Sequence, residues 1–60
     1  MNRYLIIEVD NEGNKKASTF DYADYDTACA VQELNEMLYP ELAYLIYTTD
    51  EWVYECENNA

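Results

Sequence analysis

Hydrophobic and polar positions alternate in a way that predicts a hairpin at the start of the chain. Residues 3–9 (RYLIIEV) form a compact apolar run rich in β-branched side chains, which is typical of a strand. The cluster DNEGN at 10–14 follows, and its Gly13, the single glycine of the chain, can supply a positive φ in a turn. Residues 15–22 (KKASTFDY) then predict the returning strand.

The segment 24–39 has the spacing of an amphipathic helix. Aspartate is a favoured N-cap and suits the helix dipole, so we expect Asp24, with Asp26 in the first turn, to begin this helix. We expect Pro40 to end it, because the residue before a proline is kept out of the α conformation. The apolar positions that recur every three or four residues predict this core face: Thr27, Ala30, Val31, Leu34 and Leu38.

Beyond Pro40 the pattern predicts a second hairpin. Residues 42–48 (LAYLIYT) and 52–56 (WVYEC) are short β-type runs separated by the polar tripeptide TDE. The expected fold is therefore one small α+β domain over residues 1–60, with the element order β-β-α-β-β. Its sheet would be four-stranded and mainly antiparallel, with one helix packed on one face. The pattern does not determine the strand order.

A single helix would leave the second face of such a sheet uncovered. Alternation along the first strand puts large apolar side chains on both faces, with Ile7 on one and Ile6 on the other. We expect Ile6 and Ile46 to face away from the helix, although the second hairpin also allows the reverse. A second copy of the chain or a partner protein would then cover this face.

The net charge adds information about partners. Thirteen Asp and Glu residues against three Lys and Arg give −10, and no basic residue follows Lys16. A charge of this size attracts cationic proteins and repels nucleic acids and anionic membranes. Half of the residues are hydrophobic, so we expect a folded chain in spite of the charge. The expected partner is a basic protein.

The residue types present argue against catalysis and against a bound cofactor. There is no histidine, so a general base would have to be a carboxylate or a shifted lysine or tyrosine, and we expect no enzyme activity. The DNEGN cluster lacks the glycine and the glutamate that complete a calcium loop. Cys29 and Cys56 without histidine make a poor zinc site. Two thiols without a secretory leader indicate a reduced, cytoplasmic protein.

The candidate site is the side of the predicted helix opposite its core face. The residues expected to contact a partner there are Tyr25, Cys29, Gln32, Glu33 and Glu36. A solvated helix usually mixes charge signs to form i,i+4 pairs, and this strip carries no base. Asp24 and Asp26 would add to the negative field at the start of the helix. A solvated acidic face is the alternative interpretation.

Several features together resemble the Dmd family of small antitoxins from T4-like bacteriophages. They are the length, the element order, an aspartate-initiated helix before TACAVQELNEML, and the charged turn TTDE before VYEC. The resemblance implies a protein that binds a host ribonuclease toxin of the RnlA/LsoA type in the bacterial cytoplasm. It would occupy the basic RNA-binding groove of the toxin and protect phage messenger RNA.

Two other functions fit the same sequence. One is an acidic DNA mimic that inhibits a host restriction, repair or CRISPR nuclease, with spaced carboxylates in the place of phosphates. The other is a structural or dimerisation module whose acidity keeps it soluble. The antitoxin and the DNA mimic share one physical principle, an acidic surface that meets a basic one, and the sequence does not separate them.

Overall fold

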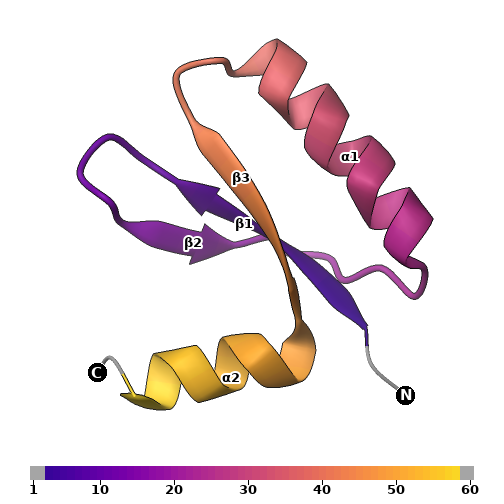
Figure 1. The fold of residues 1–60 in the computed structure, drawn as a ribbon, viewed down its shortest axis with the longest axis vertical. Helices are drawn as coiled ribbons and strands as arrows, with labels where there is room; N and C mark the ends of the chain where they lie inside the picture. Colours follow the sequence, from indigo (N-terminus) through magenta and orange to yellow (C-terminus); the bar gives the residue numbers. More distant parts are fainter. Residues whose placement is uncertain (1–2, 59–60) are drawn as a thin grey trace.

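The computed structural model describes residues 3–58, which form a small α+β domain (Figure 1). The elements in chain order are β1 (Tyr4–Val9), β2 (Lys15–Ala17), α1 (Tyr25–Leu38), β3 (Ala43–Thr48) and α2 (Thr49–Asn58). The strands form one antiparallel sheet in the order β2-β1-β3. The α+β class is confirmed, whereas the predicted fourth strand is wrong, because residues 52–56 belong to α2.

The first hairpin forms as predicted and turns at Asp10. The carboxylate of Asp10 accepts hydrogen bonds from the backbone N–H groups of Glu12 and Asn14, both at 2.9 Å. Gly13 adopts a φ of 84°, which side-chain-bearing residues rarely reach. The returning strand is shorter than expected, because regular pairing ends at Ala17.

Helix α1 begins and ends where the sequence indicates. Asp24 is the N-cap, and its side chain accepts a hydrogen bond from the backbone N–H of Thr27. The last helical residue is Leu38, and Tyr39 caps the helix directly before Pro40.

The face that α1 presents to the sheet differs in part from the prediction, since Val31 packs against the core as predicted but other positions do not. Ala28 is completely buried, while Leu34 and Leu38 are 55% and 60% exposed. Ala28 packs in one cluster with Ile6 and Tyr44, so Ile6 faces the helix and its predicted outward orientation is wrong. The sheet supplies the bulk of this core through Tyr44, and a small residue on the helix allows close approach.

Ile46 belongs to the same cluster, so its predicted outward orientation is wrong as well. The opposite face of the sheet carries Leu5, Ile7 and Tyr47, by the alternation of side chains along paired strands.

Helix α2 covers part of that opposite face. Trp52 of α2 lies against Tyr47, with ring centroids 6.0 Å apart. Ile7 is fully buried between the layers, with 0% of its surface exposed. Part of the second face is therefore covered by α2 of the same chain.

Candidate partner-binding surface

The residues predicted as a contact strip lie on one flank of α1 beside β3. Tyr25, Cys29, Gln32 and Glu36 follow each other at intervals of three or four residues, which places them in one row along the helix. Gln32 fixes the position of this row, because its Nε2 donates a hydrogen bond of 2.7 Å to the backbone carbonyl of Tyr44 in β3. Glu33 is exposed, one residue to the side of the row. We call these five residues the α1 flank.

Tyr25 is held in place at the start of the α1 flank. Its ring meets the ring of Tyr4 edge to face, with centroids 5.4 Å apart, yet Tyr25 remains 53% exposed. Hydrogen bonding with the side chain of Cys29 raises the pKa of Tyr25 above its ordinary value. An aromatic side chain that is both positioned and accessible suits an interface anchor.

The two aspartates at the start of α1 have different roles. Asp24 Oδ2 accepts hydrogen bonds from both the backbone N–H and the hydroxyl of Thr27, each at 3.0 Å, so this carboxylate is used within the fold. Asp26 lies in the first turn and is exposed. The structure therefore gives Asp24 a capping role and leaves Asp26, Glu33 and Glu36 as accessible carboxylates.

Ion pairs occupy two of the three basic side chains. Arg3 Nε lies 2.8 Å from Asp21, and Lys15 Nζ lies 2.7 Å from Glu55. Within residues 3–58, the carboxylates of α1 take part in neither of these ion pairs. The α1 flank thus presents negative charge that no ion pair among residues 3–58 neutralises.

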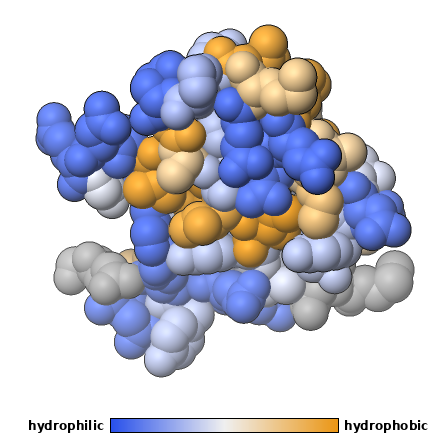
Figure 2. Space-filling model, turned by 45° about the horizontal axis from the view of Figure 1, so that its top comes forward, coloured by the Kyte–Doolittle hydropathy of each residue, from blue (hydrophilic) through white to orange (hydrophobic). Residues whose placement is uncertain are grey.

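Apolar side chains reach the surface on another side of α1. Leu34, Met37 and Leu38 are all exposed, and sequence reasoning had placed two of them in the core. Figure 2 shows hydrophobic patches interleaved with hydrophilic ones on the face that includes the upper end of the molecule in Figure 1. The helical period turns these three side chains away from the row that contains Gln32.

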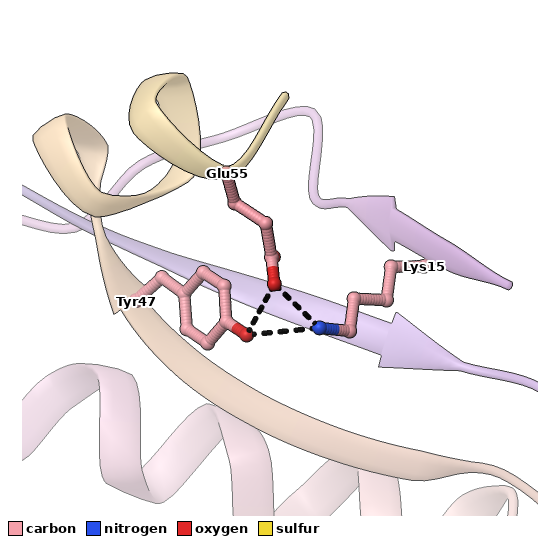
Figure 3. A network of polar contacts seen from close by, with 3 residues as sticks. All are labelled: Lys15, Tyr47 and Glu55. Atoms are coloured by element: carbon pink, nitrogen blue, oxygen red, sulfur yellow. Dashed lines mark hydrogen bonds and ion pairs between the residues drawn. The ribbon is translucent and has the colours of Figure 1, made fainter. Parts of the chain in front are cut away.

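Lys15, Tyr47 and Glu55 form a polar network that the sequence did not reveal (Figure 3). Lys15 Nζ donates to Glu55 Oε1 at 2.7 Å and to the hydroxyl of Tyr47 at 3.1 Å, and this hydroxyl donates to Glu55 Oε1 at 3.3 Å. The ammonium group also lies 5.6 Å from the centroid of the Tyr47 ring. The hydrogen bond with Glu55 raises the pKa of Lys15. The network fastens α2 to both β2 and β3.

Metal ligation and membrane insertion are two further properties that residues 3–58 could support. No group of three or more His, Cys, Asp or Glu side chains in this part is arranged to hold a metal ion. Cys29 and Cys56 are both free thiols. Neither described helix has the length and apolar character needed to cross a membrane.

Comparisons with known proteins find no match to this chain among family models, curated proteins or solved structures. The function therefore has to follow from the surfaces described above.

Proposed function

We propose that the protein is an inhibitor that acts by binding, a phage antitoxin directed against a host ribonuclease toxin of the RnlA/LsoA type. The α1 flank enters the basic RNA-binding groove of the toxin and excludes RNA. The observation that supports this proposal is the set of exposed carboxylates, Asp26, Glu33 and Glu36, that the ion pairs of residues 3–58 leave unneutralised. A groove that holds RNA is lined by Lys and Arg, so an acidic surface competes for it directly.

Charge and shape contribute to different steps of this binding. The net charge of −10 speeds the encounter with a basic groove, so added salt slows association more than it hastens dissociation. Tyr25 acts after the encounter, because a positioned aromatic ring that becomes buried mainly lowers the dissociation rate.

A pair of double variants tests the proposal. Glu33→Gln with Glu36→Gln removes two charges from the α1 flank, and Glu12→Gln with Glu57→Gln removes two exposed charges elsewhere. Both proteins are assayed for the block of RNA cleavage by a toxin of this type and for association rates at two salt concentrations. We expect the flank variant to associate more slowly and to neutralise less well than its matched control.

Two results would contradict the proposal. Equal neutralisation by the flank variant, its control and the unmodified protein would remove the α1 flank from the interface. Failure of the unmodified protein to bind any such toxin, together with tight binding to a DNA-processing nuclease, would replace the antitoxin by the DNA mimic.

A further inference from the structure

The two edges of the sheet differ in how well they are protected against further pairing. The β2 edge has only three residues and carries Lys15 and Lys16, and short, lysine-bearing edges resist the addition of another strand. The β3 edge has six residues, AYLIYT, with no charge and no proline. Strand β3 therefore lacks the devices that keep an edge strand unpaired.

Three residues of β3 turn their backbone groups to the open edge. The backbone N–H of Thr49 donates to the carbonyl of Arg3 at 2.9 Å, and bonded and non-bonded pairs alternate along an antiparallel ladder. By this alternation, Tyr44, Ile46 and Thr48 direct their N–H and C=O groups away from β1. The opposing residues of β1 are consistent with this arrangement, because their backbone N–H and C=O groups form hydrogen bonds on the β2 side of β1.

Side chains cap the two ends of this edge and leave its middle open. Gln32 donates to the carbonyl of Tyr44, and Glu51 accepts from the N–H of Thr48 at 2.7 Å. Between them, the N–H of Tyr44 and both backbone groups of Ile46 have no hydrogen-bond partner among residues 3–58. Such groups are a template for an added strand.

Helix α1 packs on the face of β3 that carries Ile46, and helix α2 packs on the face that carries Tyr47. On one side lies the α1 flank, with Glu33 and Glu36. On the other side is a shallow hollow of about 600 Å³. Its lining residues are Tyr47, Asp50, Glu51, Tyr54, Glu55 and Asn58. The carboxylates of Asp50 and Glu51 beside the ring of Tyr54 suit Arg and Lys side chains, through ion pairs and cation–π contacts, while Glu55 already pairs with Lys15.

We infer that β3 is the docking edge for an extended, basic segment of a partner protein, which joins the sheet as its fourth strand. The side chains of an added strand alternate between the faces. Basic residues on one face meet Glu33 and Glu36, and those on the other enter the hollow beside α2. The backbone groups of the segment bond to Ile46 and Tyr44.

Charge disfavours a second copy of this chain as the occupant. Antiparallel pairing of two β3 strands would bring Glu41 of one chain beside Asp50 and Glu51 of the other, at both ends of the pair. Each chain also carries −10. The inference rests on the proposed function only for the basic character of the partner, and it does not require a ribonuclease.

The first test uses a synthetic ten-residue peptide with the repeat Arg-Arg-Val-Val, which places arginines on both faces of an added strand. Its matched control has the same sequence with every backbone amide N-methylated, which keeps the charge and removes pairing along both edges of the peptide. We expect the first peptide to slow hydrogen exchange at the Tyr44 and Ile46 amides and to bind at least about tenfold more tightly than the control. Equal binding of both peptides without protection of these amides would overturn the inference. Concentration-dependent protection without any peptide would instead make a second copy the occupant.

The second test removes the outward donor from the protein itself. Chemical synthesis can place an N-methyl group on Ile46, which keeps its side chain in the core, with N-methylation of the exposed turn residue Asn11 as the control. We expect the N-methylated Ile46 variant to keep native Trp52 fluorescence and to lose its binding of the arginine-containing peptide. Undiminished peptide binding by this variant would overturn the docking edge and leave the proposed function standing. Peptide binding at β3 by the unmodified protein without neutralisation of any toxin would overturn the proposed function and leave the docking edge standing.

Discussion

Thr48 and Glu51 cap the start of α2 reciprocally. Thr48 Oγ1 accepts a hydrogen bond from the N–H of Glu51 at 3.1 Å, and Glu51 Oε1 accepts one from the N–H of Thr48 at 2.7 Å. This arrangement is a capping box, which satisfies two backbone donors at a helix start. Since Thr48 is also the last residue of β3, the chain passes from strand to helix without a loop.

The first prediction concerns this cap. Thr48→Val should lower the free energy of unfolding by about 1 kcal/mol, because the first turn of α2 loses a side-chain acceptor. The measurement is urea unfolding followed by Trp52 fluorescence. Glu57→Ala serves as the control, because it removes an acid from the unfavourable end of the same helix and should cost nothing. A Thr48→Val protein as stable as the control would contradict the capping role.

The second prediction separates the two sides of α1. Ala28→Leu should destabilise the protein by about 1–3 kcal/mol, because Ala28 is fully buried against Ile6 and Tyr44 and has no space for a larger side chain. Ala30→Leu makes the same change on an exposed position of the same helix and should leave stability nearly unchanged. Thermal unfolding measures the stability of both variants. An Ala30→Leu protein less stable than the Ala28→Leu protein would instead support the core face predicted from the sequence.

The third prediction concerns alkaline pH. The pKa of Lys15 is raised above its ordinary value of 10.5, so its ion pair stabilises the fold fully below that pH and is lost as the pH rises through the raised pKa. The difference in unfolding free energy between the unmodified protein and Lys15→Gln should therefore shrink above about pH 10.5. Burial raises the pKa of Tyr44, which destabilises both proteins in the same range and cancels in the comparison. A difference that stays constant up to pH 12 would exclude the ion pair as its cause.

The fourth prediction concerns acid. Hydrogen bonds from the turn, first of all that from the backbone N–H of Asn14, lower the pKa of Asp10 below its ordinary value of 3.8. The stabilisation by this carboxylate is therefore present above pH 3.8 and is lost as the pH falls through the lowered pKa. Asp10→Ala should be less stable than the unmodified protein at pH 7, and the two should converge in strong acid. Urea unfolding across this range measures both, and a gap that widens on acidification would contradict the assignment.

Local signals explain which parts of the fold could be predicted. The Asp10 turn, the Asp24 cap and the stop before Pro40 each depend on residues close in sequence, and all three appear in the structure. The second helix was missed because WVYEC has β propensity and TTDE was interpreted as a turn. The spacing of Thr48 and Glu51 is that of a capping box, and this signal could have identified α2.

From the sequence alone, the candidate site could be predicted only as a row of residues along one helix. The period of α1 sufficed to group Tyr25, Cys29, Gln32 and Glu36, but the larger apolar residues Leu34 and Leu38 suggested the wrong core face. The buried side of α1 carries Ala28, with Val31 packed beside it, because the sheet provides the bulky side chains. The position of the row beside an open strand follows from the strand order, which arises from long-range pairing.

The unequal edges of the sheet also decide how the protein would behave at the end of a growing β-fibre. A molecule that joined such a fibre through β3 would turn its lysine-bearing β2 edge to the next molecule. That edge is short and charged, so it would accept no further strand. Pairing through β3 would therefore not propagate from one molecule to the next, because the β2 edge offers no comparable surface for a further strand.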